Sequence, residues 1–235
     1  MNNNQTLFDS DGKILQLEFA LKIPNQGKMI FSFKSINHSY IISEIHEKKT
    51  NNKFFNRFYS IDNNIGLGIS GIFFDAKKIF NFCVELNIKI KQAFKNFCSV
   101  EYISKKISEA FSNNTLKINQ RPYAINVFII GFSDKGPIIF EISTDGLMTY
   151  KKTCLSGSSI NSYTKELFSI IKNDKKMLND EIFMISFYQC IKKSEKNSSN
   201  QIFSLSILGK KTKFTILNKI VDRFYTKIIN TKFIK

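Results

Sequence analysis

The residues that could do chemistry in this chain are few, and their spacing fits no catalytic pattern. The run Gly66–Gly71 spells G-x-G-x-x-G, the pattern of dinucleotide-binding loops. Such a loop needs its glycines after a strand and at the start of a helix, whereas these lie inside a strand-like run over residues 65–72. The two histidines, His38 and His46, have no triad or metal-ligand partner at a usable spacing. The sequence therefore predicts neither a cofactor nor a catalytic centre.

The four cysteines, Cys83, Cys98, Cys154 and Cys190, also lack the spacing of a redox pair or a metal site. Cys83 and Cys190 fall on apolar helix faces, where we expect buried, inert thiols. The chain begins with a polar stretch and has no long apolar run, so we expect no signal peptide and no membrane helix. Together these features indicate a reducing compartment, cytosol or nucleus.

The net charge of +16 suggests an affinity for polyanions such as nucleic acid. The distribution of the basic residues argues against it. Arginine, the better reader of bases and phosphates, occurs only at Arg57, Arg121 and Arg223, and the lysines are scattered singly. A solvated basic surface is the favoured interpretation, and nonspecific attraction to polyanions stays open as the alternative.

An amphipathic run opens the chain ahead of any strand. Residues 12–21 place apolar side chains at helical spacing: Ile14, Leu15, Leu17, Phe19 and Leu21. The Asp-Ser-Asp run at 9–11 offers capping oxygens, and Pro24 predicts that the helix stops before it. A helix of about three turns is marginal on its own in water, so this one needs a surface to pack on.

The rest of the chain alternates paired strands with paired helices. Strands are predicted over 29–35, 40–46, 65–72, 124–132, 137–142, 147–153, 202–208 and 212–217, and helices over 75–97, 101–113, 159–172, 178–192 and 219–229. Hairpin connections imply antiparallel pairing, and paired helices suit the outer faces of sheets. The order predicts an α+β fold, a four-layer αββα sandwich of two antiparallel sheets. Without a linker or a shift in composition, residues 1–235 are expected to form one domain.

One predicted strand, over residues 65–72, has an unusual pair of faces. Isoleucine and leucine side chains point to one side, while Gly66, Gly68 and Ser70 point to the other. A face of such small residues predicts close approach by another backbone.

The opening helix resembles a signature of proteasome alpha-type subunits. That family carries G-R-x-x-Q-x-E-Y-A near the N-terminus, and residues 12–20 here read G-K-I-L-Q-L-E-F-A. In the family this helix lies on the ring face and packs against the neighbouring subunit. The resemblance therefore implies a ring-face role for four residues: Gln16, Glu18, Phe19 and Ala20.

Further stretches resemble family motifs in the same order along the chain. They are D-N-N-I-G with S-G-I and D-A at 62–76, R-P-Y-A at 121–124, G-F…G-P…F-E at 131–141 and S-G-S at 156–158. The resemblance covers about residues 6–217 and implies the fold of proteasome subunits and N-terminal-nucleophile hydrolases: a tail and ring-face helix over 1–24, a sandwich over 25–217 and a terminal helix over 218–235. Gln26-Gly27 and the D-N-x-I-G form look most like the eukaryotic alpha type-1 branch, the sixth alpha position of the yeast ring.

The resemblance also accounts for the missing chemistry. Active beta-type subunits expose an N-terminal threonine, and alignment of the first strand puts Lys28 near that slot. Lys28 has no hydroxyl and, inside the chain, no free α-amino group, so it cannot act as the activated nucleophile. The resemblance thus implies a non-catalytic structural subunit of the 20S core, in ubiquitin-dependent protein degradation in cytoplasm and nucleus.

Family membership would also imply partners and a docking pocket. The partners are neighbouring alpha subunits, beta-ring subunits and the C-terminal tails of a regulatory particle or other activators, with no nucleic acid, membrane, metal or cofactor. Arg57 aligns with the pocket lysine that pairs with a tail carboxylate, and Gly27 and Ile72 match the other pocket positions; a solvated loop cation is the alternative for Arg57. The family's Tyr-Asp-Arg gating motif is missing, so we expect the short tail to contribute little to pore closure.

Two other function classes stay open on the sequence alone. An active N-terminal-nucleophile amidohydrolase would be favoured by a processed N-terminus at threonine or serine. A basic RNA-binding protein would require a clustered basic face with exposed aromatic side chains.

Overall fold

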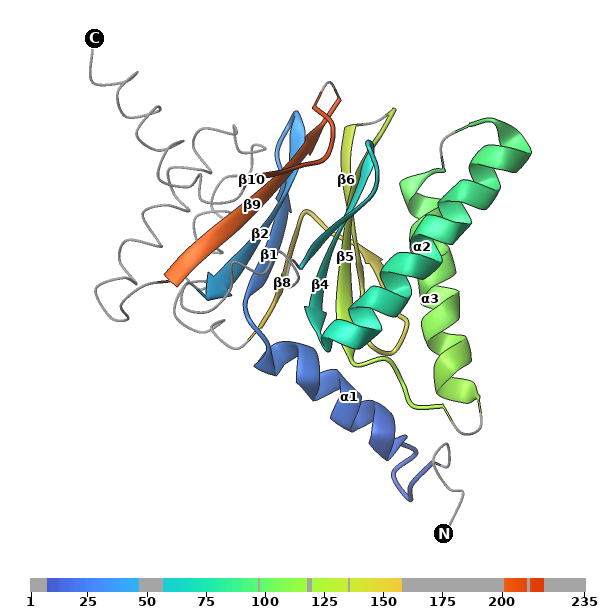
Figure 1. Cartoon of the computed structure of the whole chain (residues 1–235). Coiled ribbons are helices and arrows are strands. Elements are labelled where there is room, and N and C mark those ends of the chain that lie inside the picture. The colour runs from blue at the N-terminus through green and yellow to red at the C-terminus, as the bar shows by residue number, and fades with distance from the viewer. Residues whose placement is uncertain are drawn as a thin grey trace.

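Two five-stranded antiparallel sheets face each other at the centre of the molecule (Figure 1). The computed structural model describes residues 8–46, 57–96, 98–117, 120–134, 136–157, 201–210 and 212–217. The first sheet has the order β10 (Thr215–Leu217), β9 (Gln201–Gly209), β2 (His38–His46), β1 (Ile30–Lys34) and β8 (Thr153–Ser156). The second has the order β3 (Phe58–Asp62), β4 (Ile65–Gly71), β5 (Ile125–Ser133), β6 (Gly136–Ile142) and β7 (Met148–Tyr150).

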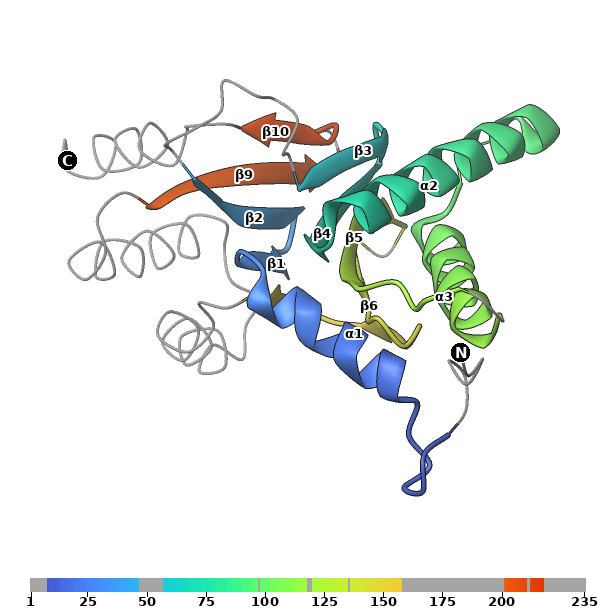
Figure 2. The ribbon, with the colours of Figure 1, turned by 60° about the horizontal axis from the view of Figure 1, so that its bottom comes forward.

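Helices α2 (Phe73–Phe94) and α3 (Val100–Leu116) cover the outer face of the second sheet, and α1 (Leu15–Gln26) lies across the ends of β4 and β5 (Figure 2). This arrangement is that of the predicted αββα sandwich. The helices expected over 159–172, 178–192 and 219–229 lie outside the described residues. None of the described helices is long and apolar enough to cross a membrane.

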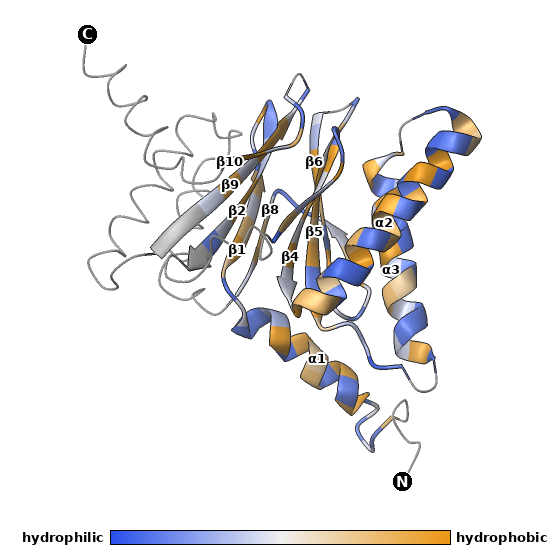
Figure 3. Cartoon of the chain, viewed as in Figure 1, coloured by the Kyte–Doolittle hydropathy of each residue, from blue (hydrophilic) through white to orange (hydrophobic). Residues whose placement is uncertain are grey.

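Strand β4 has the two faces that its alternation predicts. Its apolar side packs beneath α2 and α3: Ile65, Leu67 and Ile69. On the other side, a Cβ at Gly66 would lie 2.1 Å from the Phe214 ring, and one at Gly68 would lie 2.8 Å from the Ile41 side chain. At the two glycines the close neighbours are thus the side chains of Phe214 and Ile41, whereas at Ser70 another backbone approaches as expected, because the Ser70 hydroxyl donates to the Pro24 carbonyl at 2.8 Å. Because these glycines have no side chain, the two sheets can pack closely together. In Figure 3 much of the ribbon of the strands in the two sheets has the colour of hydrophobic residues.

Helix α3 agrees closely with its sequence pattern. Ile103, Ile107 and Phe111 are fully buried, as their spacing predicts, and the Ser99 hydroxyl caps the helix by accepting from the Tyr102 N–H at 3.2 Å. Its side chains join those of β4 and α2 in one apolar cluster between the second sheet and the helices.

Helix α2 is shorter than its apolar period predicts. Ile79 is buried, and so is Cys83, as expected, but Phe94, which lies within the helix predicted over 75–97, is 76% exposed. The helix ends there, with Lys95 in the left-handed conformation. In Figure 1 the C-terminal end of α2 extends beyond the strands, so its last apolar side chains have no sheet beneath them.

The strand assignments need three corrections. The first hairpin turns at Ile36-Asn37, because the Ser35 N–H donates to the His38 carbonyl at 2.8 Å and β2 therefore begins at His38. Strand β3 was missed; it is a short edge strand, and only its pairing with β4 defines it. The predicted strand over 147–153 is two strands, β7 and β8, which belong to different sheets.

Helix α1 runs through Pro24 and ends at Gln26, so the predicted stop before the proline is wrong. Tertiary contacts hold this last turn in place, because the Pro24 carbonyl accepts from the Ser70 hydroxyl at 2.8 Å and from the Ser156 hydroxyl at 3.2 Å. The predicted capping also differs. The Asp9 carboxylate accepts from the N–H groups of residues 11 and 13 and closes the turn before the helix, and no side chain caps the helix itself.

Substitution of Gly71 by alanine is expected to destabilise the fold severely. Gly71 has φ +112°, and an added Cβ would lie 2.2 Å from the Ala124 carbonyl oxygen, which is backbone and cannot move aside. Gly136 is the matched control, because it has φ +111° with no atom within 4 Å. We expect Gly136→Ala to cost about 1–2 kcal/mol from backbone strain alone, and Gly71→Ala at least about 2 kcal/mol more. Urea unfolding measures both; equal costs would contradict the packing argument.

Candidate functional site

Three charged side chains meet where β1 begins. The Lys28 ammonium lies 3.1 Å from a Glu44 carboxylate oxygen, and the two side chains are 30% and 6% exposed. The Arg57 guanidinium donates to the Lys28 carbonyl at 3.1 Å. Lys28 is therefore paired with a buried carboxylate, and Arg57 brings a second positive charge to the backbone of the same residue.

Arg57 is held in place by the second sheet. Its carbonyl accepts from the Ile69 N–H at 3.0 Å, which fixes the residue beside β4, directly before β3. Burial lowers the pKa of the Arg57 guanidinium, whereas the neighbouring Tyr59 and Glu44 raise it; arginine stays protonated at neutral pH. The alternative interpretation of Arg57 as a solvated loop cation is wrong, because the side chain is half-buried and hydrogen-bonded.

The structure brings two of the three predicted pocket residues together. A Cβ at Gly27 would lie 3.7 Å from the Arg57 guanidinium, 3.6 Å from the Ser70 hydroxyl and 3.4 Å from the Pro24 carbonyl. Ile72 stands at the N-cap of α2, where its N–H donates to the Ala124 carbonyl at 3.2 Å. Gly27 and Arg57 thus form one site, with Ile72 at the end of the neighbouring strand β4.

Two buried serine hydroxyl groups beside this site were not predicted from the sequence. The Ser70 and Ser156 hydroxyls lie 3.2 Å apart, both are buried, and both donate to the Pro24 carbonyl. Glu44 was also missed, although a signal existed. It continues the period-2 series of buried β2 positions, Tyr40 and Ile42, and so places a carboxylate where an apolar side chain is expected.

The four residues of the predicted ring-face helix divide into buried and exposed positions. Ala20 is buried, whereas Phe19 is 64% exposed and its neighbour on the same face, Leu15, is 56% exposed. The Gln16 side-chain oxygen is buried without a hydrogen-bond partner among the described residues, and Glu18 is half-buried in the first turn. Helix α1 therefore carries an apolar stretch that its own fold leaves uncovered.

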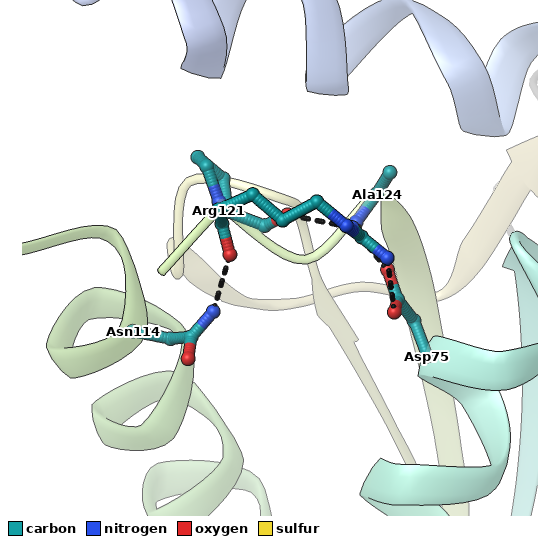
Figure 4. Close-up of polar contacts among 5 residues, drawn as sticks. Asp75, Asn114, Arg121 and Ala124 are labelled. Atoms are coloured by element: carbon teal, nitrogen blue, oxygen red, sulfur yellow. Dashed lines mark hydrogen bonds and ion pairs between the residues drawn. The ribbon is translucent and has the colours of Figure 1, made fainter. Parts of the chain in front are cut away.

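An ion pair just beyond the C-terminal end of β4 joins two of the sequence motifs (Figure 4). The Arg121 guanidinium donates to both oxygens of Asp75, at 2.7 and 2.8 Å. The Ala124 N–H donates to the same carboxylate at 3.0 Å, and the Asn114 side chain holds the Arg121 carbonyl. The hydrogen bond with Asp75 raises the pKa of Arg121. This pair fastens the loop before β5 to the first turn of α2, at the base of a cavity of about 660 Å³ between α2 and α3.

The described cysteines are buried free thiols. Burial raises the pKa of Cys83 to about 12, and also that of Cys154 to about 12, so neither is a thiolate nucleophile at neutral pH. Cys190 lies outside the described residues. Within the described ranges, no group of three histidine, cysteine or acidic side chains is arranged to hold a metal ion.

Comparison with other proteins gives one family. The proteasome subunit family matches residues 25–208. A probable proteasome subunit alpha type-6 of Schizosaccharomyces pombe is 22% identical over 93% of this chain and 81% of its own length. Proteasome subunit alpha type-1 of Dictyostelium discoideum is 19% identical over 97% and 93%. Proteasome subunit alpha of Methanosarcina thermophila is 27% identical over 72% and 69%. These similarities are to several alpha types and do not select one ring position.

Proposed function

Because this chain belongs to the proteasome subunit family, we propose that it is a non-catalytic alpha-ring subunit of the 20S core that supports ring assembly and activator docking. The relatives matched over most of its length are named as alpha-type subunits. The exposed apolar stretch of α1 supports an assembly role, because an uncovered amphipathic face indicates a partner surface.

The non-catalytic part of the proposal rests on one observation, namely the position of Lys28 in the chain and the contacts that it makes. The residue lies inside the chain between α1 and β1, its side chain is bound to Glu44, and its carbonyl is bound to Arg57. An N-terminal nucleophile needs a hydroxyl or thiol and a free α-amino group at that place. Lys28 supplies neither.

The partners follow from the same proposal. Neighbouring alpha subunits would cover Leu15 and Phe19 of α1, and beta-ring subunits would complete the particle. The C-terminal tail of a regulatory particle or another activator would dock at Arg57 and Gly27, where a cation lies beside a glycine. Cytoplasm and nucleus are the proposed locations.

A covalent probe for N-terminal threonine nucleophiles tests the absence of catalysis. We expect no labelling of the purified full chain, because the nucleophile position is an internal lysine. An active beta-type subunit treated in parallel serves as the positive control. Specific labelling of any threonine or serine of this chain, located by peptide mass mapping, would contradict the proposal.

A further inference from the structure

The charges at the start of β1 do not balance. Lys28 and Arg57 are two cations, whereas Glu44, at 6% exposure, is one carboxylate, which pairs with Lys28 and also raises the pKa of Arg57. A site with one unmatched positive charge is complementary to one carboxylate. We propose that Lys28 is a second ligand for the docking tail's carboxylate, beside Arg57, and that Glu44 positions the Lys28 ammonium for it. This inference rests on the proposed docking function.

The geometry of Lys28 suits this role. An ammonium has three donors, and only one contact, with Glu44 at 3.1 Å, occupies it among the described residues. The side chain is 30% exposed, so the remaining donors are accessible to a ligand. The Arg57 guanidinium binds the carbonyl of this same residue. The guanidinium thus lies beside the backbone of the residue that carries the ammonium, and a carboxylate with two oxygens can accept from both cationic groups.

Glu44 has two opposing effects on such a ligand. It holds the flexible lysine side chain in one place, which lowers the entropy lost on binding. Its negative charge also repels an arriving carboxylate, since it lies close enough to Arg57 to raise that residue's pKa. Replacing Glu44 by glutamine keeps a hydrogen-bond acceptor beside Lys28 and removes the repulsion. The structure thus predicts stronger tail binding in Glu44→Gln.

The test uses the full-length chain and a short fluorescein-labelled leucine–alanine peptide with a free C-terminal carboxylate. Its C-terminally amidated twin is the control ligand. By fluorescence anisotropy we expect the acid to bind and the amide not to bind. Arg57→Ala and Lys28→Met should each weaken binding by at least about fivefold, Lys28→Arg should retain it, and Glu44→Gln should strengthen it by about threefold.

A charge-matched double variant separates a direct ligand from a general electrostatic effect. Lys28→Met with Glu44→Gln removes one positive and one negative charge, so the site keeps the net charge of the native chain. If Lys28 binds the carboxylate, the double variant should still bind about twofold more weakly than the native chain, because the loss of the lysine contact exceeds the gain from removing the Glu44 repulsion. Equal affinity would overturn the inference. Because the double variant leaves no buried charge unpaired, its thermal stability should stay close to native, which is checked before binding is measured.

Loss of binding in Arg57→Ala with no change in Lys28→Met would overturn the role of Lys28 while the docking pocket itself stands. No difference between the acid and amide peptides, or no effect of Arg57→Ala, would overturn the pocket and this inference together.

Discussion

A chain carrying Leu15→Asp and Phe19→Asp is expected to fold normally and to fail to enter an alpha ring. The two side chains stand on one face of α1 at 56% and 64% exposure, so their replacement costs the isolated fold little. In a ring contact the same positions would be buried, and two desolvated carboxylates without partners would prevent association.

Co-expression with the other alpha-type subunits, followed by native mass spectrometry of the particles, measures this effect. The matched control is Asn25→Asp with Gln26→Glu, which adds the same charge to exposed positions in the last turn of the same helix. We expect the control to be incorporated normally and the double aspartate variant to remain outside the particles. Normal incorporation of the aspartate variant would refute the assembly role of α1.

Arg121→Ala is expected to destabilise the fold more than Asp75→Asn, although both break the same ion pair. Asp75 is 2% exposed and Arg121 is 54% exposed. Without Arg121 the buried carboxylate keeps only the Ala124 N–H and is left uncompensated, which costs about 3 kcal/mol. Without the Asp75 charge the guanidinium turns to water, so the loss is about 1–2 kcal/mol.

Urea unfolding of the two variants and of the double variant gives both costs and their coupling. Lys106→Ala is the control, because Lys106 and Glu109 form a solvent-accessible pair that should contribute little to stability. The expected order is Arg121→Ala, then Asp75→Asn, then Lys106→Ala. A larger cost for Asp75→Asn than for Arg121→Ala would show that the burial argument is wrong.

The elements with the strongest local patterns were predictable from sequence. Helix α3 has a capping serine, Ser99, and an apolar period that matches its buried face. The β5–β6 hairpin and the two faces of β4 follow from strict alternation of residue types. These features depend on residues within a few positions of one another, so short windows of sequence contain the necessary information.

Tertiary contacts decided where helices and strands end and which sheet each strand joins. Pro24 should stop a helix by local rules, yet hydroxyls from Ser70 and Ser156, distant in sequence, bind its carbonyl and α1 continues. Likewise, the local pattern over residues 147–153 predicts one strand, but in the structure β7 belongs to the second sheet and β8 to the first.

The candidate site was only partly visible in the sequence. The resemblance pointed to Lys28, Gly27 and Arg57 one by one, but Glu44 is 16 residues from Lys28, and Arg57 is 29 residues from it. Pairing of β1 with β2 brings Glu44 to Lys28, and packing of the second sheet against the first brings Arg57. Sequence alone thus determined which residue types are available and that no nucleophile stands at Lys28. Only the tertiary structure decided that Lys28 pairs with a buried carboxylate and that Arg57 binds the Lys28 backbone, because the net charge at a site depends on distances between strands that the sequence does not specify.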